Sequence, residues 1–295
     1  MFTDQSVKVC ESQKKKEAHM KKKLKINFHI TEACNFCCKF CFASYRRKQL
    51  TLEQQKLVIE KIADCGYFDS INFAGGEPLL IRQLPELIKY AVSFGLKTSV
   101  ITNGFLITEQ FLEEVLPNLD MIGISCHSFN EITKLKIGSC TKDGKTLSNE
   151  RLAEICARIS QINERQISNC KLKINSVICK QNVNENLKVE IEKLNDVQRW
   201  KSLRCQEFGT NQELLISDME FNIFRQINQS KNLNQVFENE MKDTYIMLNP
   251  AGELLCEAEN GVSYEVLGSF LNDDISKLLN KYNLKTELYF KRYAG

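Results

Sequence analysis

The sequence is organised around Ala33-Cys34-Asn35-Phe36-Cys37-Cys38-Lys39-Phe40-Cys41-Phe42, which follows an apolar run at residues 24–30 that is typical of a strand. Within it, Cys34, Cys38 and Cys41 form a C-x3-C-x2-C pattern, with an aromatic residue before the last cysteine. Three thiolates on a loop at the carboxyl end of a strand suit an iron–sulfur cluster, because its irons prefer soft sulfur ligands. Three ligands leave one iron of a 4Fe–4S cluster open, and an open position lets a metal site do chemistry. The pattern therefore predicts such a cluster.

Two other interpretations of the cysteines remain open. The i, i+4, i+7 spacing is also that of a buried helix face, on which the cysteines would only pack. A zinc site would need a fourth ligand, which His29 or Cys37 could supply. In the iron–sulfur interpretation Cys37 has no ligand role. The density of thiols and the polar neighbours Asn35 and Lys39 favour the cluster.

Composition excludes several classes of protein. The chain has 295 residues, of which 43% are hydrophobic and 26% charged, and its formal charge of +3 is too balanced for a generic nucleic-acid binder. No apolar run reaches the roughly 18 residues that a membrane span requires. Thirteen cysteines, an odd number, without an apolar signal segment indicate reduced thiols. We therefore expect a cytoplasmic protein that binds neither membranes nor nucleic acid.

Short apolar runs alternate with helical patterns along the chain. Strands are predicted at residues 24–30, 70–73, 98–102, 121–126, 171–178 and 199–205, and helices at 51–66, 84–94, 108–117, 148–162, 218–227 and 275–282. A hairpin is predicted around the turn Asn249-Pro-Ala-Gly252. This alternation indicates βαβ crossovers and a parallel sheet, either curved into a barrel or open. Six units are too few for an eight-unit barrel. We expect a disordered basic leader at 1–23, a core at 24–210 and an extension at 211–295.

A second motif ends the second predicted strand. Ala74-Gly75-Gly76-Glu77-Pro78 has two glycines that let the backbone approach a ligand closely. This motif, one βα unit after the cysteine pattern, resembles the radical S-adenosylmethionine (SAM) enzymes. The resemblance implies an α/β fold with a partial (βα)6 TIM-like barrel, a 4Fe–4S cluster and SAM. It also implies that Glu77 accepts hydrogen bonds from the SAM amino group.

The resemblance extends over residues 25–292. In detail, the sequence is similar to the viperin family. The similar segments are residues 27–31, 124–126, 173–178, 199–201 and 242–245. The similarity implies an antiviral dehydratase that converts CTP, UTP or GTP to its 3′-deoxy-3′,4′-didehydro form. A 5′-deoxyadenosyl radical would remove hydrogen from C4′, the 3′-hydroxyl would leave as water, and a flavodoxin- or ferredoxin-like protein would supply electrons.

The viperin resemblance also implies roles for individual residues. The SAM-binding residues would be Gly75, Gly76, Glu77, Asn103, Ser125 and Val177. The nucleotide-binding residues would be Asn27, Lys173, Asn175, Arg199, Lys201 and Tyr245. Lys173 and Tyr245 would be catalytic, and the Tyr245 phenol could donate a proton or a hydrogen atom. A tyrosine at the start of a hairpin can equally be a packing residue.

Part of this site follows from the residues themselves. Side chains alternate along a strand, so Lys173 and Asn175 share one face, as do Arg199 and Lys201. The outer face of a barrel must be apolar to receive helices, so these polar side chains would point inward. Unpaired cations in a closed lumen are costly, and an anionic ligand such as a triphosphate removes that cost. The alternative is that they lie at strand ends in solvent.

The sequence departs from the viperin pattern at four positions. Ser70, Ala74, Ser139 and His127 stand where viperins have Lys, Ser, Arg and Asp. These differences affect phosphate contacts and base preference, and Lys142 and Lys145 are candidates to replace the lost cations. The chain shows no amphipathic membrane-anchoring helix at its start, and we expect a cytoplasmic monomer of the microbial type.

Two alternative functions remain. A radical SAM enzyme acting on a peptide or another small molecule would share the cysteine motif. Many peptide-modifying members carry additional cysteine clusters in the C-terminal part, whereas Cys205 and Cys256 are isolated here. A non-catalytic metal-binding protein, with zinc in a structural loop, is the alternative from a different class.

Overall fold

The computed structural model describes residues 24–43, 45–165, 167–207, 212–241, 243–259 and 263–293. The basic leader predicted at residues 1–23 lies outside these ranges. The strands are β1 (Leu24–Thr31), β2 (Phe68–Gly75), β3 (Lys97–Thr102), β4 (Met121–Ser125), β5 (Lys171–Ile178), β6 (Val197–Arg204), β7 (Asn234–Glu238), β8 (Ile246–Leu248), β9 (Glu253–Glu257) and β10 (Tyr264–Ser269). The α-helices are α2 (Leu52–Asp64), α3 (Leu84–Ser93), α4 (Glu109–Val115), α5 (Glu131–Lys136), α6 (Asn149–Glu164), α7 (Leu187–Ile191), α8 (Asp218–Ile227), α9 (Ile275–Lys281) and α10 (Thr286–Tyr293).

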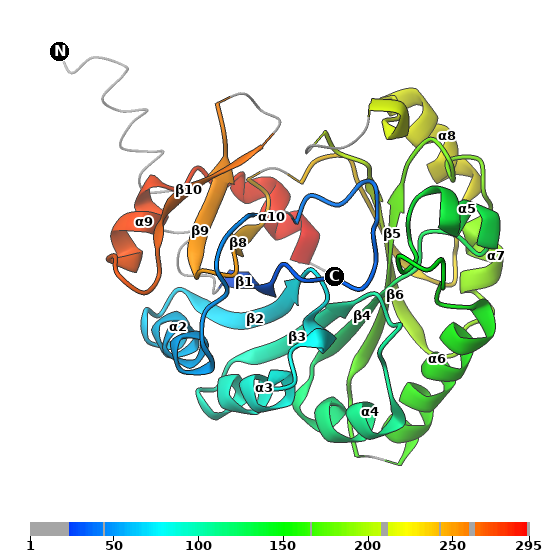
Figure 1. Ribbon diagram of the computed structural model, residues 1–295. Helices are drawn as coiled ribbons and strands as arrows, with labels where there is room; N and C mark the ends of the chain where they lie inside the picture. The colour runs from blue at the N-terminus through cyan, green and yellow to red at the C-terminus, as the bar shows by residue number, and fades with distance from the viewer. Residues whose placement is uncertain are drawn as a thin grey trace.

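The described strands form one strongly curved sheet in the order β10-β9-β8-β1-β2-β3-β4-β5-β6-β7. Strands β1 to β6 are parallel neighbours in chain order, as expected for successive βα units. Helices α2, α3, α4 and α6 lie on the outside of the curve, and the loop after β1 crosses its opening (Figure 1). The sheet does not close on itself, which confirms the prediction of a partial barrel.

Alternation along the strands separates an apolar outer face from a polar lumen. On β1, Ile26, Phe28 and Ile30 are fully buried among the outer helices, while Asn27 and His29 face inward. The capping box predicted at Thr51 and Gln54 is present at the start of α2. The lumen is therefore lined by polar side chains, and this is where ligands can bind.

The C-terminal part of the chain extends the sheet at both edges. Strand β7 pairs in parallel with β6, and β8 pairs in parallel with β1. The predicted hairpin is confirmed, because β8 and β9 pair antiparallel across the turn at Asn249 and Gly252. Sequence periodicity missed β7, β10, α5, α7 and α10. Within the described ranges, no helix is both long and apolar enough to cross a membrane.

Candidate active site

The cysteine loop lies at the carboxyl end of β1, above the lumen. Cys34 and Cys41 are exposed and Cys38 is half-buried. Burial raises the pKa of Cys38, and the neighbouring thiols of Cys41, Cys34 and Cys37 raise it further. In the described part of the chain no three His, Cys, Asp or Glu side chains surround a single-ion site. A 4Fe–4S cluster instead takes one thiolate on each of three separate irons, which suits this donor set.

Both residues considered as a fourth zinc ligand are engaged elsewhere. The Nδ1 atom of His29 lies 2.5 Å from the Tyr45 hydroxyl, inside the barrel, where burial lowers the pKa of His29 to about 4. The Cys37 thiol donates to the carbonyl oxygen of Cys140 at 3.3 Å. His29 and Cys37 each have a hydrogen-bond partner within the chain, which favours the cluster over a zinc site that would need one of them.

The cysteine loop is supported by residues 137–140. The Cys37 amide donates to the Cys140 carbonyl at 3.0 Å, and the Lys39 amide donates to the Ile137 carbonyl at 2.9 Å. Gly138 has φ +75°, and a Cβ there would lie 2.3 Å from the Cys37 carbonyl oxygen. Only glycine permits both this conformation and this close approach.

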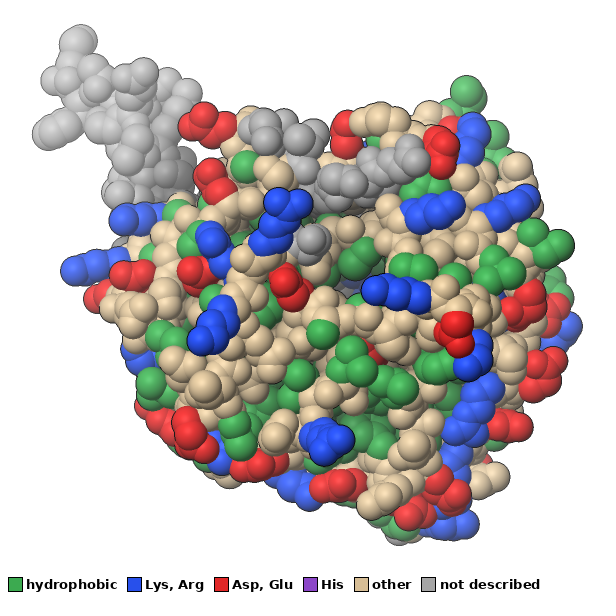
Figure 2. All heavy atoms as spheres, in the orientation of Figure 1, with side chains coloured by type: hydrophobic (Ala, Val, Ile, Leu, Met, Phe, Trp, Pro, Cys, Tyr) green, Lys and Arg blue, Asp and Glu red, His purple; other side chains and the backbone are tan. Residues whose placement is uncertain are grey.

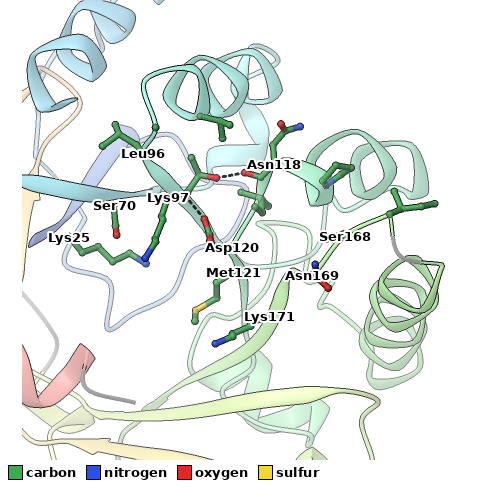
Figure 3. A pocket seen from close by; sticks show the side chains of 16 residues that line it. Lys25, Ser70, Leu96, Lys97, Asn118, Asp120, Met121, Ser168, Asn169 and Lys171 are labelled. Carbon is green, nitrogen blue, oxygen red and sulfur yellow. Dashed lines mark hydrogen bonds between the residues drawn. The ribbon is translucent and has the colours of Figure 1, made fainter. Parts of the chain in front are cut away.

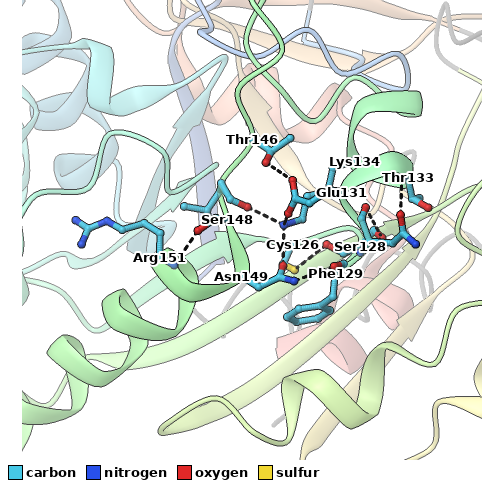
Figure 4. Close-up of polar contacts among 12 residues, drawn as sticks. Cys126, Ser128, Phe129, Glu131, Thr133, Lys134, Thr146, Ser148, Asn149 and Arg151 are labelled. Atoms are coloured by element: carbon cyan, nitrogen blue, oxygen red, sulfur yellow. Dashed lines mark hydrogen bonds and ion pairs between the residues drawn. The ribbon is translucent and has the colours of Figure 1, made fainter.

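Helix α5 and the start of α6 hold that supporting segment in place. The buried Lys134 ammonium lies 2.7 Å from a Glu131 carboxylate oxygen, from the Leu147 carbonyl and from the Asn149 side-chain oxygen (Figure 4). Charge-assisted bonds to three separate points restrict the loop that connects the two helices. The arrangement gives residues 137–140 a rigid base beneath the cysteine loop.

We predict that Gly138→Ala impairs cluster assembly. The added Cβ collides with the Cys37 backbone and forces an L residue into left-handed backbone geometry, which alone costs about 1–3 kcal/mol. We expect reconstituted Gly138→Ala protein to hold less than about half of the wild-type iron, since an ångström-scale shift of a supporting group disturbs a metal site. Gly144→Ala is the matched control, because Gly144 has φ +81° and a Cβ there would approach nothing closer than 4.0 Å. Equal iron contents in the two variants would contradict the supporting role.

The glycine motif lies beside the exit of β1. A Cβ on Gly75 would lie 2.3 Å from the Thr31 carbonyl oxygen, and one on Gly76 would lie 2.2 Å from the Ala33 carbonyl oxygen. The Gly76 amide donates to Thr31 at 2.8 Å and the Glu77 amide to Ala33 at 2.8 Å. The glycines thus let this backbone run directly against the start of the cysteine loop.

Glu77 makes hydrogen bonds within its own chain at the ends of β2 and β3. Its side chain is fully buried and accepts hydrogen bonds from the Leu79 amide (3.0 Å), the Thr102 hydroxyl (2.7 Å) and the Asn103 amide (2.7 Å). Burial raises the pKa of this carboxyl group, while the three donors oppose that rise. These hydrogen bonds tie the carboxylate to the ends of β2 and β3.

The other predicted SAM residues surround the same end of the barrel. The Asn103 side-chain nitrogen donates to Asn35 at 2.8 Å and lies 3.9 Å from the Cys34 sulfur. Ser125 is half-buried at the end of β4. The Val177 amide donates to the His127 ring at 2.9 Å, and its carbonyl accepts from Asn182 at 2.9 Å. These bonds fix the Val177 backbone at the end of β5.

Below these residues, a row of hydrogen-bonded polar side chains runs along the inner face of β1, β2 and β3. The Asn72 side chain donates to Asn27 at 3.0 Å, and the Ser99 hydroxyl donates to Asn72 at 2.8 Å. Asn27 in turn donates to the Ile246 carbonyl at 3.2 Å. These bonds fix the Asn27 side chain in the lumen, where sequence analysis placed a substrate-binding residue.

The predicted cations are brought together on β5 and β6. Lys173 pairs in register with Arg199, and Asn175 with Lys201. Lys201 is only 4% exposed and Asn175 8%, so they face the lumen and not solvent. Burial and the neighbouring cations Lys201 and Arg199 hold the pKa of Lys173 well below its ordinary value. The lumen therefore carries concentrated positive charge.

Glu238 is a site residue that sequence analysis missed. Its carboxylate lies 2.6 Å from the Lys201 ammonium, and the other oxygen accepts a hydrogen bond from the Tyr245 hydroxyl at 2.6 Å. The Lys201 ammonium also contacts the Tyr245 hydroxyl and lies 4.5 Å from the centre of its ring. Alternation of side chains along β7 would have directed Glu238 into the lumen, but the sequence pattern did not predict β7.

The four departures from the viperin pattern have separate surroundings. Ser70 donates to Asp69 at 2.5 Å, and the buried His127 packs edge-on against Phe40, with ring centres 4.8 Å apart. Ala74 and Ser139 are buried. The candidate replacements are exposed, and Lys145 forms an ion pair with Asp143 at 2.9 Å. The face of the molecule seen in Figure 2, in the orientation of Figure 1, shows basic and acidic side chains interspersed, with no large patch of one sign.

Comparison with known proteins identifies similar chains. Residues 28–172 match the Radical SAM superfamily. The chain is 35% identical over 278 residues to an S-adenosylmethionine-dependent nucleotide dehydratase of Selenomonas ruminantium, covering 92% of this chain and 99% of that protein. It is 34% identical over 259 residues to a nucleotide dehydratase of the same description from Flammeovirga pacifica, covering 81% and 84%. Among solved structures, Streptococcus suis SuiB bound to S-adenosylmethionine has a TM-score of 0.68 at 18% identity, covering 98% of this chain and 74% of that one. This structural likeness concerns the fold alone.

Proposed function

This chain belongs to the S-adenosylmethionine-dependent nucleotide dehydratases of the radical SAM superfamily, and on that basis we propose that it removes water from a ribonucleoside triphosphate. The product would be the 3′-deoxy-3′,4′-didehydro nucleotide of CTP, UTP or GTP. Such a nucleotide has no 3′-hydroxyl, so a polymerase that incorporates it cannot extend the chain. The proposed biological role is therefore antiviral defence.

The cofactor site consists of the cysteine loop and the strand ends beside it. Cys34, Cys38 and Cys41 would hold the 4Fe–4S cluster. Gly75, Gly76, Glu77, Asn103, Ser125 and Val177 would contact SAM. When bound, cluster and SAM together supply a carbon-centred radical that takes a hydrogen atom from the ribose. Gly75 and Gly76 let the backbone after β2 run directly against the start of the cysteine loop.

The assignment of a nucleoside triphosphate as substrate rests on the cations of the lumen. Lys173, Arg199 and Lys201 lie on the inner face of β5 and β6, and burying several cations together is costly even where Glu238 pairs with Lys201. A triphosphate supplies three to four negative charges, and lysine and arginine are common phosphate partners. Asn27 and Asn175 would orient the ribose with their amide groups. With the phosphates on β5 and β6, the ribose would lie toward the cofactor end.

Tyr245 is the proposed proton donor. After loss of hydrogen at C4′, the 3′-hydroxyl must gain a proton to leave as water, and one electron from the reductant completes the double bond. Glu238 and Lys201 hold the Tyr245 hydroxyl in the lumen, and Tyr282 holds its backbone through a hydrogen bond of 2.7 Å. An oriented phenol can deliver a proton to the departing oxygen without solvent.

We predict that Tyr245→Phe separates radical formation from dehydration. The variant keeps the ring but loses the acidic hydroxyl, and loss of a general acid costs about 10²–10⁴-fold in rate. We expect 5′-deoxyadenosine to form in the presence of nucleotide, while the dehydrated product falls at least about 100-fold. Product and 5′-deoxyadenosine are quantified by mass spectrometry in the same reaction. A wild-type ratio of the two would exclude Tyr245 as the proton donor and leave it a packing residue.

The extension at 211–295 completes the site in this proposal, because Glu238 and Tyr245 come from it, while residues 24–210 form the core. We propose that the enzyme is cytoplasmic, since its cluster ligands must stay reduced. We also propose that it acts as a monomer. A flavodoxin- or ferredoxin-like protein would supply its electrons.

The direct test uses reconstituted enzyme with SAM, dithionite and each of the four ribonucleoside triphosphates. We expect a nucleotide lighter by one water, together with 5′-deoxyadenosine, for at least one of CTP, UTP and GTP. Formation of 5′-deoxyadenosine at equal rates with and without every nucleotide would favour a peptide or another small molecule as substrate. A colourless protein with stoichiometric zinc would support the non-catalytic alternative.

A further inference from the structure

Cys37 is a thiol of the cysteine loop to which the iron–sulfur cluster gives no role. Among the described cysteines only Cys34, Cys37 and Cys41 are exposed, and the first and last of these are proposed cluster ligands. An exposed thiol that binds no metal is open to reaction with small molecules in solution. The pocket of about 660 Å³ at the amino ends of the strands offers no such thiol, because the described residues that line it include no cysteine (Figure 3). We therefore looked for a reaction partner of Cys37 in the cysteine loop and its support.

The residue that lies against Cys37 is a second cysteine, Cys140. The Cys37 amide donates to the Cys140 carbonyl oxygen at 3.0 Å, and the Cys37 thiol donates to the same oxygen at 3.3 Å. Residues linked by such a backbone bond in an antiparallel pair have Cα atoms about 5.5 Å apart, and a disulfide joins Cα atoms about 4.4–6.8 Å apart. Burial raises the pKa of Cys140, and the Cys37 thiol raises it further through its charge and a side-chain hydrogen bond. The two thiols are therefore within reach of a disulfide bond.

Cys140 is held in its position opposite Cys37. The residues on either side of it are fixed, because the Ser139 amide donates to the Lys134 carbonyl at 2.9 Å and the Thr141 amide donates to the Lys145 carbonyl at 2.9 Å. Cys140 itself is only 7% exposed. An exposed thiol thus faces a buried one on a fixed segment. This arrangement suits a reaction in which the first thiol meets the reagent and the second displaces it.

We propose that Cys37 and Cys140 are a modification site, at which exchange with a small disulfide such as oxidised glutathione joins them by a reversible disulfide bond. In the first step the Cys37 thiolate attacks one glutathione sulfur, a mixed disulfide forms and one glutathione thiolate leaves. The Cys140 thiolate then attacks the Cys37 sulfur, and the second glutathione thiolate leaves. Two protein thiols are oxidised, one glutathione disulfide is reduced, and the two thiol protons pass to the two glutathione thiolates. Excess reduced glutathione reverses both steps.

The bond would fasten the cysteine loop to residues 137–140 without using a cluster ligand. Cys34, Cys38 and Cys41 keep their thiolates for iron, and Cys37 can no longer pair with any of them. The two segments are already joined by the backbone bonds of Cys37 and Lys39. Because loss of a cluster requires local opening of the loop that holds it, we expect the disulfide to slow the release of iron. This inference concerns the loop itself and does not depend on the substrate of the enzyme.

The test uses reconstituted holoenzyme from which reductant has been removed anaerobically. The protein is incubated with oxidised glutathione, free thiols are blocked with N-ethylmaleimide in denaturant, and unreduced peptides are mapped by mass spectrometry. We expect the peptide that contains Cys37 to be joined to the peptide that contains Cys140. In parallel, iron transfer to a chelator is followed by absorbance, and we expect it to be at least about twofold slower in the oxidised wild type than in the reduced wild type.

Three variants control this result. In Cys140→Ser we expect glutathione to remain on Cys37 as a stable mixed disulfide, and iron release to be the same before and after oxidation. In Cys37→Ser, a change at an exposed position, we expect the buried Cys140 to stay unmodified. Cys65→Ser is the matched control outside the loop, because the half-buried Cys65 thiol donates to the Ile62 carbonyl at 3.1 Å. It should leave the bond between Cys37 and Cys140 unchanged.

The opposite results overturn the proposal. Glutathione that stays on Cys37 in the wild type would show that Cys140 does not displace it. A disulfide from Cys37 or Cys140 to one of the three proposed cluster ligands would show that the two thiols are not each other's partners. Equal rates of iron release from the oxidised and reduced wild type would contradict the fastening of the loop. No nucleotide is present in these experiments, so their failure leaves the proposed function untouched, and a failure to dehydrate nucleotides leaves this inference untouched.

Discussion

Alanine at Cys34, Cys38 or Cys41 is expected to abolish both the iron–sulfur absorbance and SAM cleavage. Each of these thiols would be the only protein ligand of one iron. Loss of an outer hydrogen-bond partner of a metal ligand lowers metal affinity or activity by up to roughly 100-fold, so loss of the ligand itself should lower them further. Cys37→Ala is the matched control in the same loop, because that thiol is turned to the Cys140 carbonyl. Iron content, absorbance and 5′-deoxyadenosine are measured after anaerobic reconstitution. A cluster lost equally in Cys37→Ala would show that the ligands are wrongly assigned.

Glu238→Ala is expected to destabilise the free enzyme strongly. The change leaves the Lys201 ammonium, 4% exposed, without its counter-charge at 2.6 Å. Breaking a buried ion pair by removing one partner costs about 3–5 kcal/mol. A bound triphosphate would supply the missing negative charge, so we expect it to raise the melting temperature of the variant more than that of the wild type.

The control for Glu238 is a surface ion pair. Lys89 and Glu114 lie 2.9 Å apart, but both side chains are about half exposed. Glu114→Ala should therefore change the free energy of unfolding by no more than about 1 kcal/mol. Denaturant unfolding and thermal melting, with and without triphosphate, compare the two variants. Similar losses in both, or no added stabilisation by triphosphate in Glu238→Ala, would contradict the lumen as a phosphate site.

The features accessible from sequence were those set by local pattern. The cysteine spacing placed a loop after β1, and period-two alternation placed Lys173, Asn175, Arg199 and Lys201 on the inner face. Both depend only on residues close together in the chain. The Thr51 capping box and the turn at Asn249 are local in the same way, and the structure contains both.

The features that were missed depend on contacts between distant segments. Strand β7 has five residues and is recognisable only because it pairs with β6, so Glu238 had no assigned direction. The burial of the Glu77 carboxylate follows from donors on β3 and its following residue, which the glycine motif does not encode.

The most direct test follows one hydrogen atom. The reconstituted enzyme is given SAM, dithionite and a ribonucleoside triphosphate deuterated at C4′, and both products are analysed by mass spectrometry. We expect deuterium in 5′-deoxyadenosine and a nucleotide that has lost the label and one water in equal amounts. Unlabelled 5′-deoxyadenosine beside unchanged nucleotide would contradict dehydration of a nucleotide by this chain.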